Sequence, residues 1–89
     1  RCAEVLGALA APERLRIIRL LAHGERNVTQ IIEGAEVPAL NVSHHLAVLK
    51  QARLVQARKQ GRFVIYSITP EVLEEVIEAG LDRESLNLG

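Results

Sequence analysis

Short polar side chains are concentrated in residues 40–50, which read Leu-Asn-Val-Ser-His-His-Leu-Ala-Val-Leu-Lys. At about 100° per residue in a helix, Val42, Leu46 and Leu49 fall within one narrow arc, so we expect this arc to pack inward. The opposite face is uncharged and carries small or hydrogen-bonding groups: Asn41, His44, Ala47, Val48 and Gln51. The major groove of DNA offers donors, acceptors and thymine methyl groups to such side chains. The stretch is therefore a candidate recognition helix.

Four side chains of this candidate helix are assigned to DNA. His44 points into the proposed groove face, where we expect it to contact a base edge or a phosphate. Ser43 lies at the border of the buried arc, from which its hydroxyl can reach a phosphate or a base. Asn41 fits two roles equally well, namely bidentate contact with adenine or capping of the backbone. Lys50, at the far end of the helix, is expected to contact a phosphate or to stay solvated.

The remaining metal-binding and reactive groups predict no catalytic or metal site and no cofactor. His45 lies nearer the buried arc and is predicted to bond a backbone carbonyl; adjacent helical residues do not share one face, so His44 and His45 are not expected to hold a metal. The single cysteine, Cys2, cannot form a disulfide within the chain, so it is either inert or a dimer-linking or thiol-sensing residue. The sequence has no Gly-rich phosphate loop and no Cys–His pairing at a plausible spacing, so an enzyme is not expected.

Charge is distributed unevenly along a chain whose net charge is zero. Residues 37–70 contain no acidic residue, and their basic residues are Lys50, Arg53, Arg58, Lys59 and Arg62. A basic, acid-free third of the chain that contains the candidate recognition helix is typical of a face that binds a polyanion. The alternative is a chance segregation of solvated charges.

The first half of the chain predicts helices around this candidate. Pro12 is expected to begin a helix that ends at Gly24. Arg14, Arg16 and Arg19 are expected to be solvated on its surface, and the alternative for one of them is contact with a phosphate. Asn27 and Gln30 form a capping box that begins a short helix, and Gly34 is expected to end it. Pro38 then begins the candidate recognition helix. A short helix, a tight connection and a second helix with a polar outer face make a helix-turn-helix, which spans about residues 28–53.

Residues 54–68 predict a β-hairpin whose turn is Gln60-Gly61. If Lys59 pairs with Arg62, one face of the hairpin, predicted to be the core face, carries Val55, Ala57, Val64 and Tyr66. Like charges across a hairpin tip are unfavourable for folding, so we expect the tip to serve an anionic partner. The residues assigned to contact with phosphates or the minor groove are Arg58, Lys59, Gln60 and Arg62. Arg53, before the hairpin, occupies a place that suits glycine, so it is strained or the helix ends differently.

Two further helices are predicted at residues 2–10 and 70–80, the second with Thr69 as its cap and Pro70 at its first position. Their apolar stripes exceed what one thin core of this size can cover, so we expect a homodimer. The residues assigned to its interface are Val5, Leu6, Leu9, Val72, Leu73, Val76, Ile77 and Leu81. Residues 1–89 form one domain. The lack of a long apolar run or a leader predicts no membrane span and a cytoplasmic location, which a lone cysteine fits.

Four segments in this order resemble the ArsR/SmtB family of winged-helix repressors. They are residues 6–17, residues 42–50, Leu54-Val55, and residues 58–62 with Tyr66. The resemblance implies a mainly α fold with a β-hairpin wing, in the order α-α-α-α-β-β-α, that dimerises through its terminal helices. It also implies a repressor bound to a palindromic double-stranded DNA operator and released by an effector or by thiol oxidation.

The chain departs from this family at both of the family's familiar metal sites. Asn27 and Thr29 stand where one branch of the family has a pair of cysteines, and the last predicted helix has glutamates but no histidine. Carboxylates alone are poor zinc ligands, so we expect no metal site and leave the effector unknown. The alternative function is a winged helix used for protein contacts without DNA binding.

Overall fold

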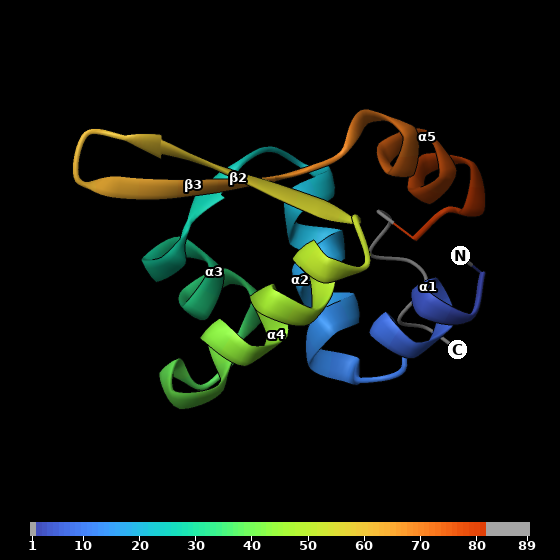
Figure 1. Ribbon diagram of the computed structural model, residues 1–89, viewed down its shortest axis with the longest axis horizontal. Helices are drawn as coiled ribbons and strands as arrows, with labels where there is room; N and C mark the ends of the chain where they lie inside the picture. The colour runs from blue at the N-terminus through green and yellow to red at the C-terminus, as the bar shows by residue number, and fades with distance from the viewer. Residues whose placement is uncertain (1, 82–89) are drawn as a thin grey trace.

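The structure, a computed structural model, describes residues 2–81. Its elements are α1 (Cys2–Ala8), α2 (Pro12–Ala22), β1 (Arg26–Asn27), α3 (Val28–Ala35), α4 (Ala39–Gln51), β2 (Val55–Gln60), β3 (Phe63–Ile68) and α5 (Pro70–Ala79). Apart from β1, this is the order that the sequence predicts. The wing, β2 and β3, extends to one side of the molecule, and α1 and α5 are both on the other side (Figure 1). Within residues 2–81, no helix is long and apolar enough to cross a membrane.

The core forms where α2, α3 and α4 meet the sheet. Its largest fully buried side chains include Ile17 and Ile18 of α2, Ile31 of α3 and Leu49 of α4. Val42, Leu46 and Leu49 are all buried, which confirms the predicted inner arc of the candidate recognition helix. α4 therefore contributes one whole face to the core and leaves the opposite face free.

The capping box at the start of α3 is confirmed. The backbone N–H of Gln30 donates to the Asn27 side-chain oxygen, and the backbone N–H of Asn27 donates to the Gln30 side-chain oxygen, both at 2.9 Å. The prediction that Gly34 ends this helix is wrong, because α3 continues to Ala35 and its cap, Glu36, takes a left-handed conformation. Gly34 instead lies where α3 approaches Leu20 of α2, and a Cβ there would come within 2.9 Å of a Leu20 methyl carbon.

A third strand was not predicted, and the hairpin register differs from the prediction. β1 pairs with β3 in an antiparallel sheet of order β1-β3-β2. The turn is Gly61-Arg62 rather than Gln60-Gly61, so Gln60 pairs with Phe63 and Lys59 with Val64 rather than with Arg62. Gly61 has a φ of 63°, which suits a glycine at the first turn position. Side chains alternate between the two faces of a strand, so a register error of two residues keeps each side chain on its predicted face. Val55, Ala57, Val64 and Tyr66 therefore still share one face.

Hydrogen bonds join the segment that follows α4 to Thr69, the residue just before α5. Arg53 follows the cap residue of α4 with a φ of 64°, so it occupies the left-handed place expected of a glycine. The hydroxyl of Thr69 donates to the carbonyl of Arg53 at 3.2 Å, and the Thr69 N–H donates to the carbonyl of Leu54 at 3.2 Å. Thr69 is the N-cap residue of α5, as predicted, although its side chain makes no hydrogen bond to the first turn of the helix.

Other boundaries differ by a residue or two. α1 ends at Ala8 rather than at residue 10, and α4 begins at Ala39, with Pro38 preceding it as the N-cap residue. α5 ends at Ala79 and is followed by Gly80 in a left-handed conformation. These shifts leave the order of the helices as predicted.

Two arginines of α2 were predicted to be solvated, and both instead bond the carbonyl ends of neighbouring helices. Arg14 donates from Nε to the Ala8 carbonyl at 2.6 Å, at the end of α1. Arg16 donates from Nε to the Ala35 carbonyl at 2.8 Å and from Nη2 to the Glu36 carbonyl at 3.2 Å, at the end of α3. Positive side chains at helix C-termini satisfy unpaired carbonyls and oppose the helix dipole.

The guanidinium of Arg14 also reaches α4. Its Nη1 lies 3.3 Å from Nδ1 of His45, which is 8% exposed. Because a guanidinium can only donate, Nδ1 is the acceptor and the imidazole is neutral. The prediction that His45 is structural agrees with this burial, but the described contact is with an arginine and not with a backbone carbonyl. Burial, followed by the positive charge of Arg14, lowers the pKa of His45.

The lowered pKa of His45 predicts a pH-dependent stability. The unfolded chain binds a proton at His45 at a higher pH than the folded chain does, so the free energy of unfolding falls as the pH drops below about 6.5. His45→Gln should reduce this fall, measured by urea denaturation at about pH 7.5 and about pH 5.5. Gln51→Ala, a change to an exposed residue of the same helix that carries no titratable group, is the control and should keep the wild-type pH dependence. Equal pH dependence in the wild type and His45→Gln would contradict the assignment.

Candidate nucleic-acid interface

One row of exposed side chains runs along the outer face of α4. The row follows helical spacing i, i+3, i+4, i+7 and i+11, and we call it the recognition stripe: Leu40, Ser43, His44, Ala47 and Gln51. Asn41 and Lys50 are exposed beside it. Val48, predicted to face outward, is half-buried and packs against the core. The exposed face of α4 therefore differs slightly from the predicted one: Ser43 lies within it rather than at its border.

The recognition stripe itself carries no charge. It presents a hydroxyl, an imidazole and an amide, together with the methyl of Ala47 and the whole side chain of Leu40. No role was predicted for Leu40 from the sequence. It precedes Ser43 by three residues and His44 by four, which places it on the same face of the helix. An uncharged face of donors, acceptors and methyl groups is suited to base edges rather than to phosphates.

The tip of the wing is basic and also carries an aromatic ring. Lys59, Gln60, Arg62 and Phe63 are all exposed there. The guanidinium carbon of Arg62 lies 5.6 Å from the centroid of the Phe63 ring, which is a cation–π distance. The wing and the N-terminal end of α4 extend toward the same side of the molecule in Figure 1. The basic tip therefore lies on the same side as the start of the recognition stripe.

Arg58, the fourth predicted wing residue, lies against an acid that sequence reasoning missed. Its Nη1 and Nη2 donate to the two carboxylate oxygens of Glu25 at 2.7 and 2.9 Å, and Nη2 also donates to the Gln60 side chain at 2.9 Å. These hydrogen bonds lower the pKa of Glu25 and raise the pKa of Arg58. Both side chains are about half exposed, so solvent screens the pair.

β1 explains why Glu25 lies so close to the wing. Asn27 of β1 and Arg58 of β2 both pair with Ile65, from opposite sides of β3. Glu25, just before β1, therefore reaches across β3 to Arg58. No signal in the sequence marked this contact, because the two-residue strand was not predicted.

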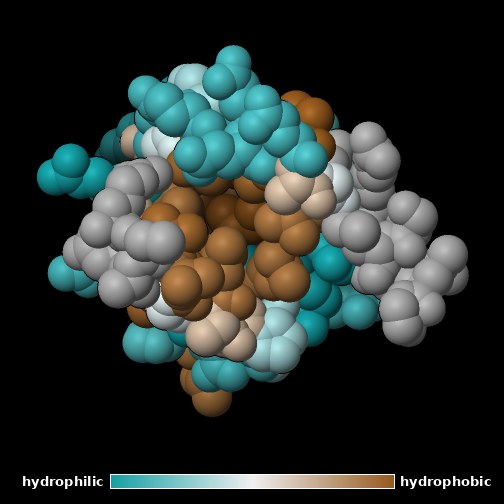
Figure 2. All heavy atoms as spheres, turned by 90° about the vertical axis from the view of Figure 1, so that its right-hand side faces the viewer, coloured by the Kyte–Doolittle hydropathy of each residue, from teal (hydrophilic) through white to brown (hydrophobic). Residues whose placement is uncertain are grey.

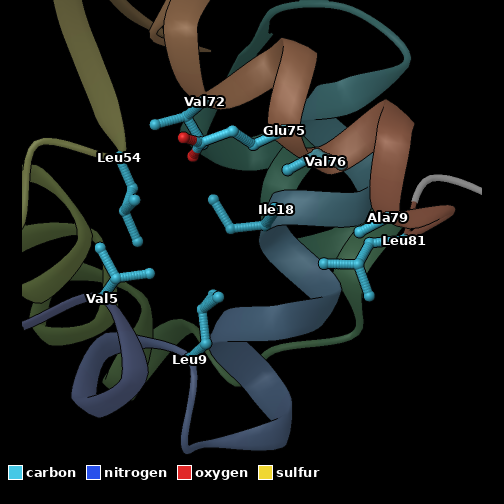
Figure 3. A pocket seen from close by; sticks show the side chains of 9 residues that line it. All are labelled: Val5, Leu9, Ile18, Leu54, Val72, Glu75, Val76, Ala79 and Leu81. Atoms are coloured by element: carbon cyan, nitrogen blue, oxygen red, sulfur yellow. The ribbon is translucent and has the colours of Figure 1, made fainter. Parts of the chain in front are cut away.

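The opposite side of the molecule carries an apolar hollow of about 190 Å³ between α1, α2 and α5. Figure 2 shows it as a hydrophobic area beneath a hydrophilic rim, and Figure 3 shows the side chains around it. It is lined by Val5, Leu9, Ile18, Leu54, Val72, Glu75, Val76, Ala79 and Leu81. Of these, Glu75 supplies the only charged group.

The residues predicted for a dimer interface divide into two groups. Val72 and Val76 are buried in the core of their own chain, so they are not the free stripe that the sequence suggested. Leu6 and Ile77 are exposed large apolar residues on α1 and α5. Val5, Leu9, Leu73 and Leu81 are partly buried against the core. Free apolar surface on this side thus comes mainly from Leu6, Ile77 and the hollow.

Metal-ligand side chains do not cluster within the described residues. Residues 2–81 contain no group of three or more His, Cys, Asp or Glu that could hold a metal ion. The side chain of Cys2, for which two roles were left open, lies outside what the structure describes.

Known proteins resemble the chain in sequence and in fold. Residues 11–57 match the family described as bacterial regulatory protein, arsR family. An uncharacterized HTH-type transcriptional regulator of Methanocaldococcus jannaschii is 39% identical and aligns with 88% of this chain and 89% of its own length. The HTH-type transcriptional repressor SmtB of Mycobacterium tuberculosis is 38% identical over 89% of this chain, which spans only 62% of that repressor.

Solved structures agree with this match. The homodimeric winged helix-turn-helix DNA-binding domain of a Mycobacterium bovis protein superposes with a TM-score of 0.79 at 34% identity, covering 99% of this chain and 83% of that one. HlyU from Vibrio cholerae superposes with a TM-score of 0.78 at 29% identity, covering 88% of this chain and 86% of that one. The chain has the winged helix-turn-helix fold and belongs to the ArsR family of bacterial regulatory proteins.

Proposed function

We propose that this chain is a dimeric transcriptional repressor of the ArsR/SmtB type that acts in the cytoplasm on a palindromic DNA operator. The observation that carries the proposal is the uncharged recognition stripe on α4, on the same side of the molecule as a basic wing tip. An effector that is still to be identified releases the operator. The relatives reported above are regulators of transcription, and this function requires no catalytic group.

Each subunit places the recognition stripe in a major groove. The first residues of a recognition helix reach base edges, so Asn41, Ser43 and His44 contact bases. Lys50 at the far end of α4, with Lys59 and Arg62 at the wing tip, contacts phosphates, which set position and affinity but little sequence choice. Gln60 at the wing tip contributes a neutral contact to the backbone or the minor groove.

The second copy of the chain covers the side that carries the apolar hollow. The M. bovis domain with the same fold is a homodimer, and Leu6 and Ile77 are large exposed apolar residues on α1 and α5, two of the helices that border the hollow in this chain. Two copies joined there place two recognition stripes in successive major grooves, about 34–36 Å apart. A palindromic operator matches this symmetry.

Salt-dependent, sequence-selective binding is the direct test of the proposed function. The measurement is fluorescence anisotropy with the duplex that lies upstream of the chain's own gene, against a scrambled duplex, over a salt series. The upstream duplex should bind more tightly, with log K falling as log salt rises. Lys59→Ala and Arg62→Ala should each make the slope of log K against log salt shallower by about one unit per subunit, because each removes one phosphate contact. Absence of binding to either duplex at low salt would overturn the proposal and favour a protein-interaction module.

The contact between Glu25 and Arg58 predicts a variant that binds DNA more tightly. Glu25→Ala frees Arg58 for a phosphate, so affinity should rise by about two- to fivefold at low salt and the salt slope should steepen. Glu74→Ala is the matched control, because it removes the same charge from an exposed site on α5. Equal gains from both variants would show that net charge, and not the release of Arg58, causes the effect.

The proposed dimer predicts that a charge on the apolar side separates the subunits. Ile77→Asp places a carboxylate among apolar side chains, so sedimentation velocity at micromolar protein should shift from dimer toward monomer. Leu40→Asp, which changes an exposed apolar residue on α4 instead, should leave the dimer intact. A wild-type chain that sediments only as a monomer would contradict the two-half-site geometry.

A further inference from the structure

Leu40 is the most exposed large apolar residue of the described chain. It is 94% exposed, against 67% for Leu6 and 48% for both Phe63 and Ile77. Leaving a leucine in water forgoes a favourable burial, and a charged or polar residue would serve a solvated helix start better. Leu40 makes almost no contact within its own chain, so its side chain is free for a contact with another molecule.

The position of Leu40 separates it from the apolar side of the molecule. It lies in the first turn of α4, which begins at Ala39. Figure 1 shows that end of α4 on the side away from α1 and α5. A second copy bound at the apolar hollow therefore does not reach Leu40, so the proposed dimer does not account for it.

The neighbours of Leu40 indicate what covers it. Ser43 and His44 lie one helical turn along the same recognition stripe, and Ala47 lies two turns along. In the major groove, hydroxyl and imidazole groups meet the donors and acceptors of base edges, and the apolar group that a base presents there is the thymine C5-methyl. We propose that Leu40 reads a thymine methyl group in each half-site of the operator, an inference that rests on the proposed function.

This contact discriminates between bases in a defined way. Cytosine at the same place presents only a C5–H where thymine has its C5-methyl, so the apolar contact with Leu40 is lost. Leu40 therefore selects thymine over cytosine at one position, and the two-fold symmetry of the dimer repeats that choice in the other half-site.

The test replaces thymine by deoxyuridine, which removes only the methyl group and keeps the base pairing. The probe is a duplex selected from a random library by the wild-type protein, and each thymine is replaced in turn before affinity is measured by fluorescence anisotropy. At one position per half-site, the replacement should weaken wild-type binding by about fourfold, which is the change in affinity expected for the loss of one buried methyl group. For Leu40→Ala, the same replacement should have no effect, while the preferences at other positions remain.

Leu6→Ala is the matched control, because it truncates another exposed leucine on a different helix. Its ratio of affinities for the thymine and deoxyuridine duplexes should equal that of the wild type, whatever its effect on the dimer. Thermal unfolding should give the same melting temperature for Leu40→Ala and the wild type, because Leu40 is almost fully exposed and packs against little.

The outcomes separate this inference from the proposed function. If the wild type selects no sequence and binds no duplex, the proposed function itself fails. If the wild type binds its selected duplex but tolerates deoxyuridine at every position, the role of Leu40 is overturned. Equal deoxyuridine sensitivity in Leu40→Ala and the wild type would overturn it as well.

Discussion

Burial of one face of α4 is the constraint on which the remaining structure depends. Val42, Leu46 and Leu49 are almost completely withdrawn from solvent, so the rotation of the helix about its own axis is fixed. A rotation by one residue, about 100°, would expose part of this arc and bury part of the recognition stripe. The identity of the exposed groups is therefore set by hydrophobic packing. The surface that we propose to read DNA is rigid because its reverse side is the core.

Electrostatics add a second constraint, which follows from the fold rather than from composition. The basic segment of residues 37–70 contains no acid, yet the fold brings Glu25 to Arg58. Free positive charge is thereby concentrated at the wing tip, at Lys59 and Arg62, instead of being spread along the whole hairpin. In the proposed complex, the pair leaves the phosphate contacts of the wing to its tip.

The features that the sequence predicted well are local. The capping box of Asn27 and Gln30 depends on residues three apart, and the left-handed Arg53 depends on where one helix ends. The face of the hairpin was predicted because alternation survives a shift of two residues. The register was not predicted, because Gln60-Gly61 and Gly61-Arg62 are both acceptable two-residue turns and the alternation of side chains does not distinguish them.

The features that the sequence did not predict depend on contacts between distant residues. β1 exists because two residues meet β3, and no two-residue segment has a signal of its own. Arg16 was predicted to be solvated, since nothing local shows that the end of α3, some twenty residues away, lies within its reach. The orientation of the candidate site shifted for the same reason: Val48 is half-buried by packing that helical periodicity cannot show, and the stripe includes Leu40 instead.

Hydrogen bonds join α4 to both helices of the apolar side. Arg14 links the last carbonyls of α1 to His45 in the middle of α4, and Thr69 links the start of α5 to the segment just after α4. α4 is thus held at two points by groups that belong to, or bond directly with, the proposed dimer helices. A displacement of α1 moves the acceptors of Arg14, and a displacement of α5 moves Thr69. A change in the packing of either helix therefore has a short physical route to the recognition stripe.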